Sequence, residues 1–163
     1  MSAAVTHEAV RRALLEQQVS YETVACDPAL ADTAAFCDAY GFDPADSANC
    51  ILIVSRRPPG HYLTTLVLAT TRLDVNGLCC RLMAVRRASF APGDQTAQLT
   101  GMDIGGVTPF GLPRDLLPVR VDAAVMSRSR VIVGGGDRSV KLVLDPAVFA
   151  TLPDFEVVEG LAG

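Results

Sequence analysis

The chain has 163 residues, half of them apolar, and carries a formal net charge of −4 with a pI near 5.0. This length and apolar content favour one folded domain over residues 1–163 and argue against disorder. The acidic balance disfavours general nucleic-acid binding such as DNA binding, and no apolar run approaches the ~20 residues of a membrane span. The N-terminal residues lack the basic and apolar segments of a signal peptide, so we expect a cytoplasmic protein without a membrane partner.

Helix and strand patterns alternate through the first half of the chain. Thr6 can cap a first helix with Val10 and Leu14 on one face, and residues 20–25 then alternate as in a strand. The next expected elements are a helix from Asp32 or Thr33 to Gly41, a short helix or turn at 43–44, a strand at 50–54 that is buried on both faces, and its hairpin partner at 62–69.

The second half continues the mixture without a regular βαβ rhythm. The expected elements are a helix capped by Asp74, a strand at 86–90, a helix from Pro92 to near Gly101, strands at 118–122, 130–134 and 139–144, and a final helix from Pro146. Together the patterns predict an α/β (α+β) fold in which a curved, mixed and largely antiparallel sheet of about six to seven strands is flanked by helices.

Residues 100–111 hold four of the thirteen glycines, together with a proline. Gly105 and Gly106 allow positive φ and close approach to the main chain, whereas Pro109 stiffens the segment. Such a loop can direct backbone N–H groups toward a carbonyl or a developing oxyanion without a catalytic side chain. The alternative is an ordinary turn between two elements.

The titratable residues do not form a familiar catalytic or metal-binding pattern. His7 lies near the N-terminus and His61 in a Pro-Gly turn, which disfavours a Ser-His-Asp triad and a histidine metal site. The five cysteines contain no C-x-x-C pair, which fits reduced thiols. Neither the glycines at 105–106 nor those at 134–136 have the pattern of a P-loop or of a dinucleotide-binding turn. We therefore expect no metal and no other cofactor.

Two glycine blocks carry a family resemblance. Residues 105–111 are GGVTPFG, residues 131–142 are VIVGGGDRSVKL, and the short strand at 118–122 separates them. In order and spacing these blocks resemble the G-x-x-x-P loop and the C-terminal strand, turn and strand of the YbaK/prolyl-tRNA-synthetase-associated editing domain family. Residues 32–36 and 47–52 fall where this family has its first helix and first central strand.

The resemblance implies a mixed sheet surrounded by helices and the activity of a free-standing aminoacyl-tRNA deacylase that edits in trans. The partner is then the acceptor end of an aminoacyl-tRNA, with an aminoacyl-tRNA synthetase as a further candidate. An aminoacyl ester is activated by its own amine, and the neighbouring ribose hydroxyl can take part in proton transfer. The protein therefore mainly supplies position, oxyanion donors and a dry pocket.

Positions carried over from the family define the expected site. The catalytic group comprises Asn49, Gly105, Gly106, Thr108 and Pro109. The substrate-binding group comprises Thr33, Val107, Phe110, Gly134, Gly135, Gly136, Arg138 and Lys141.

Asn49 is the main departure from the family pattern. Many members have a lysine ahead of the first central strand, whereas this chain has Ala48-Asn49-Cys50. Asparagine donates hydrogen bonds but brings no positive charge. The chain is then either an editor with a changed anchoring contact or a binding module that holds an aminoacyl end or a small ligand. A purely structural turn residue is the third interpretation of Asn49.

Arginine pairs are candidate phosphate contacts in this acidic chain. They are Arg56-Arg57, Arg86-Arg87, and Arg128 with Arg130. A solvated face is the alternative explanation for such short pairs.

Overall fold

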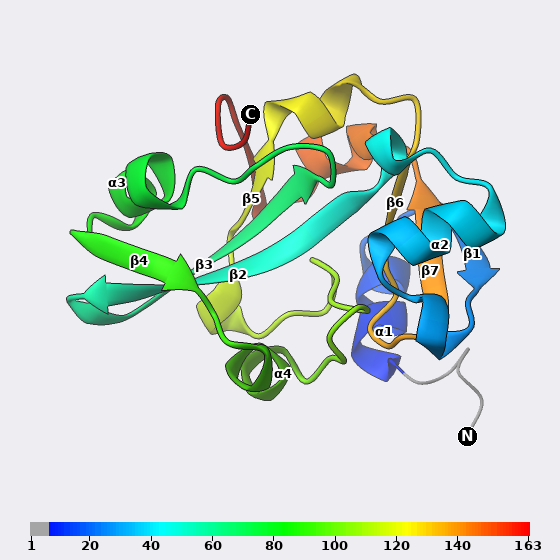
Figure 1. Ribbon diagram of the computed structural model, residues 1–163, viewed down its shortest axis with the longest axis horizontal. Helices are drawn as coiled ribbons and strands as arrows, with labels where there is room; N and C mark the ends of the chain where they lie inside the picture. The colour runs from blue at the N-terminus through cyan, green and yellow to red at the C-terminus, as the bar shows by residue number, and fades with distance from the viewer. Residues whose placement is uncertain (1–6) are drawn as a thin grey trace.

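The computed structural model describes residues 7–163 and contains eight strands in two sheets, with helices packed around them (Figure 1). The strands are β1 Glu22–Ala25, β2 Ala48–Arg57, β3 Pro59–Leu68, β4 Arg87–Phe90, β5 Val119–Asp122, β6 Val131–Gly134, β7 Val140–Leu144 and β8 Phe155–Val158. The α-helices are α1 Glu8–Glu16, α2 Thr33–Tyr40, α3 Cys80–Met83 and α4 Gly93–Thr100. The other helical turns are η2 Pro28–Leu30, η3 Pro44–Asp46, η4 Val75–Cys79, η5 Arg114–Leu116, η6 Ala123–Ser127 and η7 Pro146–Ala150.

The larger sheet has the strand order β4-β2-β3-β5-β8 and is built on the β2–β3 hairpin. Its antiparallel register runs from Ala48 opposite Leu68 to Val54 opposite Tyr62. Strands β5 and β8 then add in parallel, so the sheet is mixed. The strand predicted at 50–54 and its hairpin partner at 62–69 are confirmed. Residues 52–54 and 63–68 are buried, whereas Cys50 and Ile51 are only partly buried because they line a cavity, so burial on both faces holds for only part of the first run.

The smaller sheet has the order β1-β7-β6, and all its pairings are antiparallel. A parallel bridge between Ser47 and Ile132 joins it to the start of β2. Phe36 of α2 packs on this sheet against Ile132 and Val143. The predicted fold class is confirmed, although the strands divide between two sheets.

Sequence signals at several helix ends act as predicted. The Asp74 carboxylate accepts hydrogen bonds from the N–H groups of Gly77 and Leu78, at 3.0 and 3.1 Å. Gly41 ends α2 in the left-handed conformation, with φ of 76°. The N-cap position of α1 is His7, and the proposed cap Thr6 lies outside the described residues. Within the described part of the chain, no helix is long and apolar enough to cross a membrane.

Candidate active site

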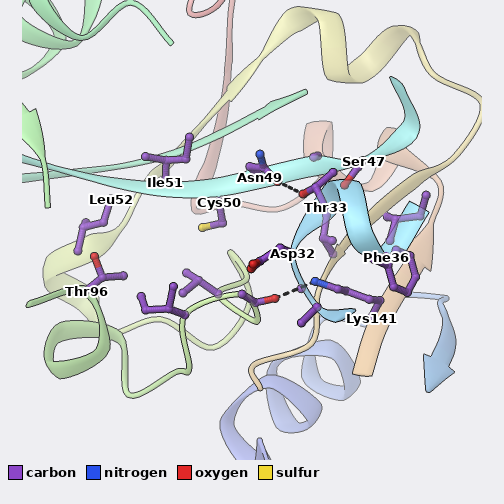
Figure 2. A pocket seen from close by; sticks show the side chains of 18 of the residues that line it. Asp32, Thr33, Phe36, Ser47, Asn49, Cys50, Ile51, Leu52, Thr96 and Lys141 are labelled. Atoms are coloured by element: carbon purple, nitrogen blue, oxygen red, sulfur yellow. Dashed lines mark hydrogen bonds between the residues drawn. The ribbon is translucent and has the colours of Figure 1, made fainter. Parts of the chain in front are cut away.

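A cavity of about 370 Å³ lies where the two sheets meet (Figure 2). Its walls come from the first half of β2, the start of α2, the glycine loop at 104–107, the end of β4 with the start of α4, and the adjoining parts of β6 and β7. Six of the residues predicted for the site line it: Thr33, Asn49, Gly105, Val107, Gly134 and Lys141. The cavity is therefore the natural candidate for a binding or catalytic site.

Gly106 lies behind the cavity wall, where the glycine loop packs closely against the backbone at 136–137. Its N–H donates to the carbonyl of Asp103 at 2.9 Å, and its carbonyl accepts from the N–H of Gly136 at 2.7 Å. A Cβ on Gly106 would collide with the Asp137 backbone, so only glycine fits. Because its N–H already has an acceptor, Gly106 is a poor candidate for an oxyanion donor.

The neighbouring peptide groups are better placed. Gly105 and Val107 both line the cavity. Within residues 7–163, neither N–H group donates to a protein acceptor. Gly105 also has a φ of 91°, which a side chain would strain. Of the two glycines expected to supply hydrogen-bond donors, Gly105 thus keeps an N–H group that is free within the described residues, as does Val107, whereas Gly106 does not.

The second glycine turn serves close packing more than binding. A Cβ on Gly134 would lie 2.5 Å from the carbonyl oxygens of Gly106 and Val107. Gly135 faces Val140, and Gly136 packs directly against the His7 side chain. Among these three glycines, only Gly134 reaches the cavity. The turn lets the glycine loop lie against β6, which forms that wall.

Lys141 of β7 brings an ammonium group to the glycine loop. Its Nζ donates to the Gly105 carbonyl at 2.8 Å and lies 5.6 Å from the centre of the Phe36 ring. The residue is only 8% exposed. Burial lowers the pKa of Lys141, and the nearby Arg138 guanidinium acts in the same direction. Lys141 therefore positions Gly105 and is the cation that lines the cavity.

Arg138 lies outside the cavity wall and holds two segments together. Its Nε donates to the Pro28 carbonyl at 2.9 Å, and its terminal nitrogen donates to the Ile104 carbonyl at 2.8 Å. The same nitrogen lies 3.4 Å from the carboxylate of Asp32, which lines the cavity. Arg138 thus fixes the glycine loop to the start of α2 and does not itself line the cavity.

Asn49 and Thr33 form one hydrogen-bonded unit on the opposite wall. The Thr33 hydroxyl donates to the Asn49 side-chain carbonyl at 3.1 Å, as Figure 2 shows. This contact leaves the Asn49 amide nitrogen with its two N–H donors for another group. Two residues that are 16 positions apart in sequence therefore act together, which the carried-over family positions alone did not indicate.

Thr108, Pro109 and Phe110 turn away from the cavity. Thr108 is fully buried, and its hydroxyl has no partner among the described residues. Pro109 lines a separate hollow beside α1. Phe110 is 3% exposed and packs against Phe149 and Phe155, with ring centres 6.1 and 5.9 Å away. These positions support the loop from the main core and do not reach a molecule in the cavity.

Several cavity residues were not anticipated from the sequence. Cys50 points into the space between β2 and the glycine loop, and burial raises the pKa of its thiol to about 12. A thiol with this pKa stays protonated at neutral pH and is a poor nucleophile. Asp32, Phe90, Thr96 and Ile104 complete the rim. Only their adjacency to predicted site residues could have signalled them.

Comparisons with solved structures agree with this architecture. A crystal structure of the hypothetical protein APE2540 matches with a TM-score of 0.83 and 19% identity, covering 95% of this chain and 99% of the other. A candidate trans-editing enzyme for prolyl tRNA synthetase matches with a TM-score of 0.78 and 21% identity, covering 98% and 97%. At these identities the likeness establishes the fold.

Sequence comparison identifies the family. The search of curated proteins found no match. The family model described as the aminoacyl-tRNA editing domain matches residues 27–152, which include every residue of the cavity wall. The chain therefore belongs to the aminoacyl-tRNA editing domain family.

Proposed function

We propose that this protein is a deacylase that hydrolyses the ester bond of mischarged aminoacyl-tRNA in trans. The supporting observation is the cavity wall at Gly105 and Val107, where two N–H groups lack acceptors within residues 7–163 and Lys141 holds the adjoining carbonyl. Family membership supports an editing role for this cavity. The partners would be the acceptor end of a tRNA and, as a further candidate, an aminoacyl-tRNA synthetase in the cytoplasm.

In this proposal the ester carbonyl faces the Gly105–Val107 segment. Water adds to the carbonyl carbon, and the N–H groups together with the Lys141 ammonium stabilise the negative charge that develops on oxygen. The bond from carbon to the ribose oxygen then breaks, which releases the free amino acid and a tRNA with its hydroxyl restored. The neighbouring ribose hydroxyl can carry the proton to the leaving oxygen, so no protein base is required.

The titratable groups of the cavity fit such substrate assistance. The Cys50 thiol, with its pKa raised to about 12, is not a nucleophile at neutral pH. Asp32 lines the rim and is highly exposed. A carboxylate at the rim can attract the protonated amine of an aminoacyl group, whereas the Asn49 amide can donate to its ribose or phosphate oxygens.

The test is a panel of mischarged tRNAs incubated with the purified protein. The proposal predicts that at least one ester is lost faster than it hydrolyses spontaneously, while correctly charged tRNAs are lost slowly. No acceleration on any member would contradict it. Saturable binding of a nonhydrolysable aminoacyl-adenosine analogue without turnover would instead favour the alternative function of a binding module. The neutral Asn49 side chain, in place of the lysine of many family members, is the observation behind that alternative.

A further inference from the structure

Four exposed arginines gather at one end of the larger sheet, away from α2 (Figure 1). They are Arg56 and Arg57 at the end of β2, Arg86 directly before β4, and Arg87 at the start of β4. Arg57 lies opposite Arg87 in the antiparallel register, and the Arg86 N–H donates to the Arg57 carbonyl at 2.7 Å. We call these four residues the arginine tip.

The charges of the arginine tip are not neutralised within the described part of the protein. The ion pairs found among residues 7–163 involve other arginines, and none includes a member of the tip. Like charges that face each other across two strands are destabilising. In a chain with a net charge of −4, this local concentration of positive charge fits an anionic partner with closely spaced charges.

Strand β4 connects the arginine tip to the cavity. Its last residue, Phe90, lines the cavity and is 54% exposed, and Ile104, which also lines it, is 46% exposed. An exposed aromatic ring at a cavity mouth offers a stacking surface for a nucleic-acid base. Arg87 lies three residues before Phe90, roughly 10 Å along a strand, which is about the span of three stacked nucleotides.

β4 is an edge strand whose two end residues, Arg87 and Phe90, are exposed. β4 is the terminal strand of its sheet, so within the described residues its outer edge has no neighbouring strand. Arg87 begins the strand and Arg86 directly precedes it, and the long side chains of both exposed arginines can reach a chain that follows the edge. Guanidinium groups bind phosphates through paired N–H donors.

We propose that β4 guides the single-stranded 3′ end of an RNA into the cavity. Phe90 stacks on a terminal base, and the arginine tip binds phosphates a few nucleotides upstream. The inference rests on the proposed function, because it assigns the binding surface for that substrate.

The experiment uses an uncharged, fluorescein-labelled RNA hairpin with an unpaired 3′ end terminating in CCA, so that binding does not depend on ester hydrolysis. Fluorescence anisotropy at several salt concentrations gives the affinity and its salt slope. For the double variant Arg86→Gln/Arg87→Gln, we expect weaker binding and a slope whose magnitude falls by about 1.4, or ~0.7 for each phosphate that an arginine no longer neutralises. Phe90→Leu should weaken binding about 5-fold or more, and only when the 3′ end is unpaired.

The matched control is Arg11→Gln/Arg12→Gln on α1, which removes the same charge from another exposed pair. It should leave the salt slope unchanged. Wild-type affinity and slope in the Arg86/Arg87 variant, with equal thermal midpoints, would overturn the inference. So would failure of the wild-type protein to bind the hairpin, or an arginine-dependent affinity for phosphatidylserine vesicles in place of RNA.

The two proposals fail separately. If mischarged tRNA is not hydrolysed but the hairpin binds through Arg86 and Arg87, the deacylase proposal is wrong and the RNA surface is supported. If mischarged tRNA is hydrolysed but the Arg86→Gln/Arg87→Gln variant retains wild-type kinetics and hairpin affinity, the surface is wrong and the deacylase proposal stands.

Discussion

Replacing Lys141 by methionine removes the ammonium that holds the glycine loop. Methionine keeps an unbranched side chain beside Phe36 but provides no donor for the Gly105 carbonyl, which now accepts from Nζ at 2.8 Å. A hydrogen bond to a charged group contributes about 1.5–3 kcal/mol. If that hydrogen bond positions the oxyanion donors, kcat/KM for deacylation should fall by about 10- to 150-fold.

The same substitution has a defined effect on the pH dependence of stability. Burial lowers the pKa of Lys141 in the folded protein below its ordinary 10.5, so the unfolded chain binds more protons between the two values. Wild-type stability should therefore rise relative to Lys141→Met as pH increases through the lowered pKa toward 10.5. Near neutral pH the lost hydrogen bond and the relieved burial of the charge oppose each other, and the variant should remain folded.

The assay is single-turnover hydrolysis of a mischarged tRNA that the wild-type protein deacylates. The control is Arg11→Gln, which removes an exposed charge on α1 and should leave the rate unchanged. A folded Lys141→Met protein with the wild-type kcat/KM would refute the role given to the hydrogen bond between Lys141 and Gly105.

Three further predictions concern other positions. Asn49→Ala should reduce kcat/KM by about 2- to 13-fold, the equivalent of ~0.5–1.5 kcal/mol for one hydrogen bond, whereas Asn49→Lys should maintain or raise deacylation and make it more salt-sensitive. The structure places Asn49 in β2 and not in a turn, and unchanged kinetics in both variants would leave it a purely structural residue of that strand. Gly106→Val should lower the thermal midpoint, because its Cβ would collide with the Asp137 backbone, and a wild-type midpoint would contradict that geometry. Burial raises the pKa of Cys79 from 9.0 to about 12, so the unfolded chain releases the thiol proton at a lower pH than the folded protein does. The free energy of unfolding should therefore fall as pH rises through this window, by about 2 kcal/mol at a pH of about 10.5. Denaturation of wild type and Cys79→Ala at about pH 8 and about pH 10.5 measures this loss, and a stability difference between the two proteins that does not change with pH would contradict it.

The sequence was most informative where a local pattern determines a local structure. The apolar run at 50–54, the cap at Asp74 and the stop at Gly41 each act through neighbouring residues, and all three are confirmed. The final strand β8 was missed, because four residues at the end of the chain carry a weak pattern and pair in parallel with the distant β5.

The cavity was harder to predict, because it depends on contacts between distant segments. The family resemblance predicted the same catalytic role for Gly105 and Gly106. The hydrogen bond from the Gly106 N–H to the Asp103 carbonyl, which distinguishes the two, is seen only in the folded loop. Phe110 looked like a binding residue through its proximity to the glycines, but packing against Phe149 places it in the core. The link between Thr33 and Asn49 likewise requires α2 to lie beside β2.

The role proposed for the Gly105 and Val107 amides is tested most directly by observing the backbone amides of the glycine loop when a ligand binds. Titration of a nonhydrolysable aminoacyl-adenosine analogue into ¹⁵N-labelled protein should shift the amide signals of Gly105 and Val107, while those of Gly77 and Gly160, which lie outside the cavity wall, stay in place. If the ligand binds and the Gly105 and Val107 signals do not move, the cavity wall is not the oxyanion site and the account of the mechanism is wrong.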